Sequence, residues 1–217
     1  MFTEATPDLI LNAYFQGIFP MADSAESTHF NFYRPDKRGQ LSINDLHIPK
    51  KLLKTVKRYP YKVTIDQDFK GVIDGCARSK KGRESTWINK PIRDVFIDLH
   101  RDGYAHSIEC WQDDKLVGGL YGLAIGAVFC GESMFSEEDD ASKIALIHLC
   151  ARLHKGGFTI LDTQFTNEHL EQFGIYEIPQ EKYEEKIKTQ MVKEADFILE
   201  SLEEKEILEK YLESRNF

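Results

Sequence analysis

Apolar residues recur along the chain in two different rhythms. Positions three and four residues apart are typical of one buried helix face, and strictly alternating positions are typical of a half-buried strand. The order of these segments, with helices around a β-meander, predicts a mixed α/β (α+β) fold. The predicted helices cover residues 6–17, 50–58, 69–77, 92–103 and 141–155. The predicted strands cover residues 61–65, 105–111, 115–121, 124–129 and 158–161.

The ends of two predicted helices carry specific signals. Thr6 and Pro7 form a typical helix start, with the hydroxyl as cap and the proline at the first helical position. The Gly156-Gly157 pair is a typical helix end. From residue 181 onward the chain is rich in Glu and Lys, and its scattered apolar anchors predict helix up to the C-terminus.

Composition narrows the class of protein. The 217 residues suit one compact domain, or one domain plus a small appendage, and 41% hydrophobic residues are enough for a core. No run approaches the roughly 18 apolar residues of a membrane helix. The N-terminus lacks a basic segment followed by an apolar one, so we expect a cytoplasmic protein. The four cysteines form no C-x-x-C pair, which argues against a zinc site or a disulfide framework.

The net charge of -8 hides an uneven distribution. Residues 34–93 hold 16 Lys and Arg against 6 Asp and Glu, whereas residues 168–217 hold 14 acidic against 7 basic residues. A basic block of this size suits binding to phosphates, although a solvated surface has the same composition. Charge alone therefore leaves a nucleic-acid partner open.

The densest cationic stretch includes the helix predicted over residues 50–58. Its inner face is apolar, and no acidic residue offsets the repulsion among the basic ones, as a solvated helix normally would. We therefore expect a surface that faces phosphates, with a solvated helix face as the alternative. The surface consists of Lys50, Lys51, Lys54, Lys57, Arg58 and Lys62.

Familiar catalytic motifs are missing: the chain has no G-x-G-x-x-G, no P-loop and no H-E-x-x-H. What stands out is a set of polar residues that follow apolar strands, Glu132 after one strand and Asp162 after another. Gln164 lies two residues beyond Asp162, so in an extended strand both side chains point the same way. An amide beside a carboxylate can hold a substrate nitrogen and orient proton transfer. The alternative is that Asp162 caps the next turn.

The helix predicted over residues 141–155 follows a β-meander, an arrangement that resembles the Gcn5-related acetyltransferases. Those enzymes bind a pyrophosphate at the N-terminus of this helix. In this chain the preceding loop, residues 137–140, is Glu-Glu-Asp-Asp and would repel the phosphates of coenzyme A. We therefore expect an acetyltransferase-like sheet flanked by helices but a different acyl donor, and an acidic mouth that suits a cationic acceptor.

Several motifs occur in one order and resemble those of the leucyl/phenylalanyl-tRNA–protein transferases. The most specific is G-E-S-M-F-S over residues 131–136, followed by A-S-K over residues 141–143. The resemblance runs from about residue 9 to about residue 180. The other matching motifs are LNAYFQGIFPM at 11–21, TWI at 86–88, AHSIECW at 105–111, LVGGLYG at 116–122 and LDTQ at 161–164.

The resemblance implies an enzyme that moves Leu, Phe or Met from aminoacyl-tRNA to the α-amine of a protein beginning with Arg or Lys. The product would be marked for N-end-rule degradation. We expect a cytoplasmic monomer that uses no cofactor and no metal. The expected organisation is a smaller N-terminal α/β domain over 1–62, an acetyltransferase-like catalytic domain over 63–180 and an acidic helical tail over 181–217.

The resemblance also implies a site. Asp162 and Gln164 match the residues that draw the proton from the acceptor amine in one proposed mechanism, whereas a rival mechanism gives that task to the terminal 2′-hydroxyl of the tRNA. Glu132 and Ser133 match substrate-binding positions, where Glu132 would meet a positively charged group. The basic surface would grip the acceptor stem. A pocket for the donor side chain would be lined by Trp87, Leu120, Phe129, Leu149 and Leu161, each of which could equally be plain core, with Phe32 and Tyr33 near it.

Some positions depart from the family pattern. Residues 32–38 read F-Y-R-P-D-K-R in place of W-W-S-P-x-P-R, which leaves the preference among Leu, Phe and Met open. The usual D-C-Q is D-T-Q here, which keeps both polar groups. Two other functions stay as alternatives: an acetyltransferase-like enzyme that uses coenzyme A, and a non-catalytic RNA-binding module. The sequence assigns no role to the acidic tail.

Overall fold

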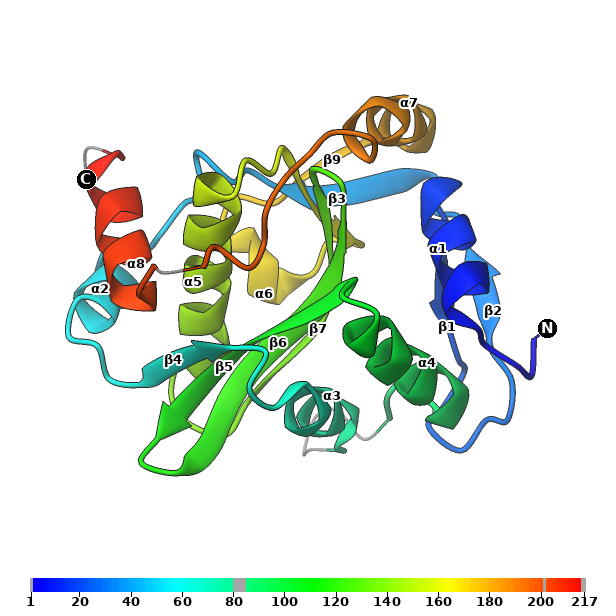
Figure 1. Cartoon of the computed structure of the whole chain (residues 1–217), viewed down its shortest axis with the longest axis horizontal. Coiled ribbons are helices and arrows are strands. Elements are labelled where there is room, and N and C mark those ends of the chain that lie inside the picture. The colour runs from blue at the N-terminus through cyan, green and yellow to red at the C-terminus, as the bar shows by residue number, and fades with distance from the viewer. Residues whose placement is uncertain (1, 80–84, 201, 216–217) are drawn as a thin grey trace.

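A seven-stranded mixed sheet forms the centre of the protein, with helices on both faces (Figure 1). The computed structural model describes residues 2–79, 85–200 and 202–215. The strand order is β4-β5-β6-β7-β8-β3-β9, in which β7 and β8 run parallel and the other neighbours antiparallel. The strands are β3 (Lys37–Leu41), β4 (Lys62–Ile65), β5 (Ala105–Gln112), β6 (Lys115–Ile125), β7 (Val128–Ser136), β8 (Ile160–Gln164) and β9 (Tyr176–Pro179).

Two clusters of buried side chains lie on opposite faces of this sheet. On one face α5 (Ala141–Lys155) lies between the strands and α8 (Glu204–Glu213), so nearly every side chain of α5 is buried. On the other face α3 (Phe69–Ala77) and α4 (Lys90–Arg101) cover the strands. The remaining elements are α1 (Pro7–Phe15), the small sheet of β1 (Phe19–Met21) and β2 (Asn31–Tyr33), α2 (Lys50–Val56), α6 (Glu168–Glu171) and α7 (Gln180–Gln190).

The mixed α+β class and the five helices predicted between residues 6 and 155 are confirmed. The Thr6 hydroxyl accepts a hydrogen bond from the Leu9 backbone N–H at 3.3 Å, and Pro7 occupies the first position of α1. Helix α5 ends at Lys155 with Gly156 as its C-cap, as the paired glycines predicted. None of the described helices combines the length and the apolar character needed to cross a membrane.

The predicted strand over residues 124–129 is wrong. β6 continues to Ile125, a two-residue turn follows, and β7 begins at Val128. The turn depends on Gly126, whose φ of 55° lies in the left-handed region that glycine adopts without strain. A Cβ atom there would also lie 2.3 Å from the carbonyl oxygen of Met191. One long hairpin therefore replaces the separate strand.

The C-terminal region also differs from the expectation of continuous helix. Helix α7 ends at Gln190, and α8 begins only at Glu204. The segment between them carries the chain from α7 to the far side of α5 (Figure 1). Within the expected N-terminal domain, β3 belongs to the central sheet, whereas α1, β1 and β2 lie at its side. The division into 1–62, 63–180 and 181–217 stays a prediction.

Candidate functional site

A cavity of about 900 Å³ opens where β7 and β8 separate. The two parallel strands pair only through residues 128–130 and 160–162. Beyond Cys130 and Asp162 they share no further paired positions, and the residues that follow on each strand line the cavity. Polar backbone at the end of a central parallel pair is a common place for a ligand site.

The wall of the cavity on the α5 side is apolar. Four of the five predicted pocket residues line the cavity: Trp87, Leu120, Leu149 and Leu161. Sequence reasoning missed Leu146, although its spacing of three residues from Leu149 places both on one face of α5. The other apolar residues of the lining are Leu41, Met134, Phe135 and Leu170.

Phe129 does not line the cavity. Its ring is fully buried and stacks on Phe197 at a centroid distance of 5.4 Å, with Phe158 beside it. It therefore belongs to the core beneath the cavity.

Phe32 and Tyr33 also lie outside the cavity lining. Both are in β2 of the small sheet, where the Phe32 ring packs against Phe2 at 5.0 Å and the Tyr33 ring stacks on Phe19 at 6.4 Å. The expectation that they lie near the donor pocket came from the family pattern. The fold places them in a neighbouring aromatic cluster instead.

The polar end of the cavity is built around Glu132. The sequence predicted that this residue ends a strand, but β7 continues to Ser136 and Glu132 is the extra residue of a β-bulge opposite Tyr121 and Gly122. The carboxylate accepts hydrogen bonds from the Tyr14 hydroxyl at 2.6 Å and from the Gln164 side-chain amide at 3.0 Å. Ser133 follows in the same wall.

Burial outweighs these two hydrogen bonds in the electrostatics of Glu132. Loss of water around the carboxylate raises its pKa to about 8, with Asp162 adding to the rise and the Tyr14 and Gln164 donors opposing it. A carboxyl group with such a pKa, facing a cavity, is able to exchange a proton near neutral pH.

Gln164 has a backbone conformation that few residues adopt. Its φ of 56° ends the extended course of β8, so its side chain does not follow the direction of Asp162, contrary to the sequence expectation. Its backbone N–H donates to Oδ1 of Asp162 at 3.1 Å, while its side chain reaches Glu132. A left-handed residue of this kind costs about 1 kcal/mol or more and is found most often at functional sites.

Asp162 itself is fully buried and does not line the cavity. Arg38 holds it with two parallel hydrogen bonds, from Nε to Oδ1 at 2.8 Å and from Nη2 to Oδ2 at 2.6 Å. The Tyr183 hydroxyl donates to Oδ2 at 3.0 Å. With the Gln164 N–H, four donors surround the carboxylate, so Asp162 meets the cavity only through Gln164.

Arg38 connects this carboxylate to two other parts of the fold. Its Nη1 donates to the Gly17 carbonyl at 2.8 Å, and its guanidinium lies between the rings of Phe19 and Tyr183. Burial alone would lower the pKa of Arg38, but the Asp162 carboxylate beside it raises that pKa overall, so the side chain stays charged. Sequence reasoning missed Arg38, although this residue is the arginine that ends the family motif over residues 32–38.

The predicted basic surface lies apart from the cavity. Its residues are all exposed, on α2, directly after it or at the start of β4. Within the described residues, no salt bridge involves any of the six cations. The same part of the chain holds no group of three or more His, Cys, Asp or Glu placed to bind a metal ion.

Comparisons with known proteins agree on one family. The sequence profile of the family described as leucyl/phenylalanyl-tRNA protein transferase matches residues 40–188, and the profile of that family's N-terminal domain matches residues 3–36. A solved structure of L-PGS from Bacillus licheniformis is a distant likeness, with a TM-score of 0.41 and 13% identity over 74% of this chain and 51% of that chain.

Curated relatives are much closer. The leucyl/phenylalanyl-tRNA–protein transferase of Maricaulis maris is 50% identical over 87% of this chain and 87% of its own length. The proteins of the same name from Rhodopseudomonas palustris (strain TIE-1) and Phenylobacterium zucineum are each 47% identical, over 90% and 87% of this chain and over 87% and 85% of their own lengths. This chain therefore belongs to the leucyl/phenylalanyl-tRNA–protein transferase family.

Proposed function

We propose that the cavity between β7 and β8 binds the aminoacyl end of a tRNA that carries Leu, Phe or Met, and that the acceptor is a protein whose N-terminal residue is Arg or Lys. The observation that carries this proposal is the division of the cavity lining into apolar residues and a polar end built around the Glu132 carboxylate. Its volume of about 900 Å³ lies within the range of small-ligand pockets, roughly 300 to 1,000 Å³.

The apolar wall suits an unbranched-at-Cβ side chain of the donor. Leu120, Leu146 and Leu149 come from β6 and α5, two elements that pack directly against each other. Burial of a Leu or Phe side chain is worth roughly 1.5–3 kcal/mol. A polar or charged donor side chain would lose its water there without gaining a partner.

The polar end suits a positively charged amine. Glu132 and Glu168 are the carboxylates of the cavity lining. An ammonium group at Glu132 would favour the ionised form of the carboxyl, which burial disfavours in the empty cavity. The same two acidic groups favour a cationic acceptor over a neutral one.

In the reaction, the acceptor amine attacks the ester carbonyl carbon of the donor. A C–N bond forms, the bond from that carbon to the tRNA ribose oxygen breaks, and the ribose oxygen leaves with a proton. No covalent enzyme intermediate is needed, because the ester is already activated and the site holds both partners in line.

The proton of the attacking amine has two possible acceptors, Glu132 and the terminal 2′-hydroxyl of the tRNA. For Glu132, the pKa of about 8 lies near the ordinary α-amine range of about 7.7–8.0, so transfer would be nearly balanced in energy. Gln164, bound to Glu132 at 3.0 Å, would hold the amine or the ester carbonyl in place. We assign direct substrate contact to Gln164 and Glu132.

We assign Asp162 a positioning role. It faces Arg38, Tyr183 and the backbone of Gln164 rather than the cavity. Its hydrogen bond to the Gln164 N–H helps to hold the left-handed conformation that turns the amide toward Glu132. The pair Asp162 and Gln164 predicted from the sequence thus stays a functional unit, with one member acting through the other.

The tRNA body would lie on the basic surface of α2. Six exposed cations without salt bridges in the described part of the chain are available to phosphates, whose contacts position a nucleic acid without reading its sequence. The finer expectations of an acetyltransferase-like sheet and of a cytoplasmic monomer stay proposals. The helix α5 after the β5–β7 meander supports the first. The second is supported by Cys110, Cys130 and Cys150, which are buried thiols outside any disulfide bond and so suit a reducing compartment.

The test of donor and acceptor uses labelled Leu-tRNA, Phe-tRNA and Met-tRNA with peptides that differ only at the first residue. We expect transfer to peptides beginning with Arg or Lys and little to one beginning with Ala. Equal transfer to all three peptides would overturn the acceptor assignment.

The test of the site uses Gln164→Ala, with Gln112→Ala at the exposed end of β5 as the matched control. Loss of a substrate-orienting amide should lower kcat by about 10²-fold, the usual lower limit for a group that assists proton transfer, with unchanged tRNA affinity. Full kcat in Gln164→Ala would contradict the role.

A further inference from the structure

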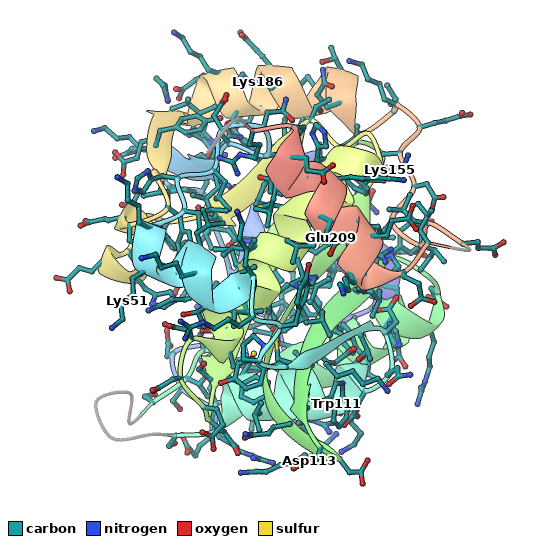
Figure 2. The ribbon with its side chains drawn as sticks, turned by 90° about the vertical axis from the view of Figure 1, so that its left-hand side faces the viewer. Lys51, Trp111, Asp113, Lys155, Lys186 and Glu209 are labelled. Atoms are coloured by element: carbon teal, nitrogen blue, oxygen red, sulfur yellow. The ribbon has the colours of Figure 1, made fainter. Side chains whose placement is uncertain are left out.

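The last part of the chain lies beyond the matched family region, which ends at residue 188. We call residues 196–200 and 202–215 the brace. Figure 2 shows its helix α8 on the same face of the molecule as α2, with Glu209 and Lys51 labelled on the two helices. Neither the cavity lining nor the basic surface contains a brace residue.

The brace is firmly attached to α5. Arg152, whose side chain is 3% exposed, donates through Nη1 to the carbonyl oxygens of Phe197 and Ile198 and pairs through Nη2 with Glu204. Burial by itself would raise the pKa of Glu204, but His148 and Arg152 lower it overall, so the carboxylate is charged in this contact. A buried ion pair of this kind fixes both ends in one arrangement.

From α5 the brace reaches both flanks of α2. Before the helix, the Tyr211 hydroxyl donates to the Ile43 carbonyl at 2.6 Å, and Arg215 donates through Nη2 to the Leu46 carbonyl. After the helix, the Tyr59 hydroxyl donates to Glu209 at 2.8 Å. The ammonium of Lys205 also lies 4.8 Å from the centre of the Tyr59 ring.

Helix α2 needs such support because its own sequence stabilises it poorly. It spans only seven residues, and isolated helices shorter than about 12–15 residues are marginal in water. Pro49 at its N-cap provides no side-chain hydrogen bond, and Lys50 and Lys51 in its first turn oppose the helix dipole. Tyr59, just beyond its end, has a φ of 50° in the left-handed region.

Packing completes the connection. The buried side chains of α2, Leu52 and Val56, belong to the same core cluster as Ile207 and Leu208 of the brace. The basic residues of α2 point the other way, into solvent. The placement of the cations in space therefore depends on contacts that the brace makes from behind.

We propose that the brace is a positioning element for tRNA, which holds α2 and its cations at a fixed place relative to the cavity. This inference rests on the proposed tRNA surface of α2. Because no brace residue lines the cavity, disruption of the brace should weaken binding of the tRNA body and leave binding of a minimal aminoacyl-adenosine fragment unchanged.

The test is the double variant Tyr59→Phe/Tyr211→Phe, which removes two hydroxyls and keeps both rings. We expect affinity for aminoacyl-tRNA to fall about three- to tenfold, as for the loss of one or two hydrogen bonds. Hydrogen exchange of the α2 amides should become faster, and affinity for the aminoacyl-adenosine fragment should not change. The control is Glu206→Gln on α8, where the exposed glutamate forms a salt bridge with Lys210 of the same helix.

A second variant separates position from charge. Glu209→Gln keeps an acceptor for the Tyr59 hydroxyl but removes a negative charge near α2, so positioning predicts no loss of tRNA affinity. Glu209→Ala removes the acceptor, and positioning predicts a loss. Equal affinities in Glu209→Ala and Glu209→Gln, which lose the same charge, would overturn the proposal.

The proposed tRNA surface and the proposed role of the brace can be refuted separately. If Lys51→Ala/Lys54→Ala weakens tRNA binding and the double tyrosine variant does not, the surface stands and the brace is refuted. If neither change weakens binding, the surface is refuted and the brace with it. A parallel loss of fragment binding in the tyrosine variant would show general damage and would also overturn the proposal.

Discussion

The change Asp162→Asn should destabilise the whole protein as well as slow the reaction. The carboxylate is 0% exposed and accepts four hydrogen bonds, two from Arg38, one from Tyr183 and one from the Gln164 N–H. Each carboxylate oxygen accepts from two donors, Oδ1 from Arg38 Nε and the Gln164 N–H, and Oδ2 from Arg38 Nη2 and the Tyr183 hydroxyl. An asparagine side chain has one oxygen and one NH₂ group, so the NH₂ group would face one of these pairs of donors. The Arg38 guanidinium would also lose its counter-ion while buried.

The size of the effect follows from this geometry. Removal of one partner from a buried, hydrogen-bonded ion pair costs about 3–5 kcal/mol. Domains of this size unfold with roughly 5–15 kcal/mol, so the variant would lose a large share of its stability. A surface pair behaves differently: Asp94→Asn, which loses only the exposed Lys90 and the partly exposed Arg93, should cost less than about 1 kcal/mol.

The assay is urea denaturation followed by far-UV circular dichroism, with Arg38→Met, Asp162→Leu and their combination as a double-mutant cycle. The combined change leaves no unpaired buried charge, so it should cost less than the sum of the single changes by at least about 1 kcal/mol. A cost below about 1 kcal/mol for Asp162→Asn, or full additivity in the cycle, would refute the reasoning. Activity of Asp162→Asn is measured well below its melting temperature, where we expect a lower kcat and an unchanged KM for aminoacyl-tRNA.

Three further outcomes test other parts of the structure. The pKa of Glu132 is raised to about 8, so between pH 4.5 and 8 the folded state keeps a proton that the unfolded chain has lost, and the free energy of unfolding should fall as pH rises by at most about 1.4 kcal/mol per pH unit. In Glu132→Gln, urea titrations across this range should lack that slope. An equal slope in both proteins would contradict the burial of Glu132. Gly122→Ala should destabilise the folded protein by more than about 1 kcal/mol in thermal melts, because the new Cβ would lie 2.3 Å from the Cys130 carbonyl oxygen in the neighbouring strand. An unchanged melting temperature would show that β6 and β7 can move apart at little energetic cost. For Lys51→Ala/Lys54→Ala, the slope of log affinity against log salt should become shallower by about 1 for each phosphate that the variant no longer neutralises, and a parallel shift with the same slope would place the tRNA elsewhere.

Much of the fold could be predicted from local patterns. Thr6 and Pro7 at the start of α1 and the glycines after α5 act through backbone chemistry within one turn, so they carry the same meaning in any context. The strand predicted over residues 124–129 failed because alternating apolar residues do not show where a hairpin reverses. Gly126 fixes that turn through its left-handed φ and through its close approach to Met191, which is far away in the sequence.

The site was predictable as a set of residues but not as an arrangement. Four predicted pocket residues, together with Glu132 and Gln164, lie at one cavity. Most of them belong to the motifs that resemble the family, so the motifs indicated which residues form the site. The direction of Asp162 was not predictable, since it depends on the left-handed turn at Gln164 and on Arg38 from a different strand. The bulge that aims Glu132 depends likewise on the register between β6 and β7.

The amino-acid sequence by itself determined the helices up to residue 155, the class of fold, the family and the presence of a basic helix that no acidic neighbour balances. Those properties follow from side-chain spacing and from motifs in which each residue acts on its near neighbours. Tertiary structure alone decided which carboxylate faces the cavity and which is buried behind it, and that the acidic C-terminal segment packs behind α2. The reason is that both outcomes depend on strand register and on contacts between residues more than a hundred positions apart, such as Arg38 with Asp162 and Tyr59 with Glu209.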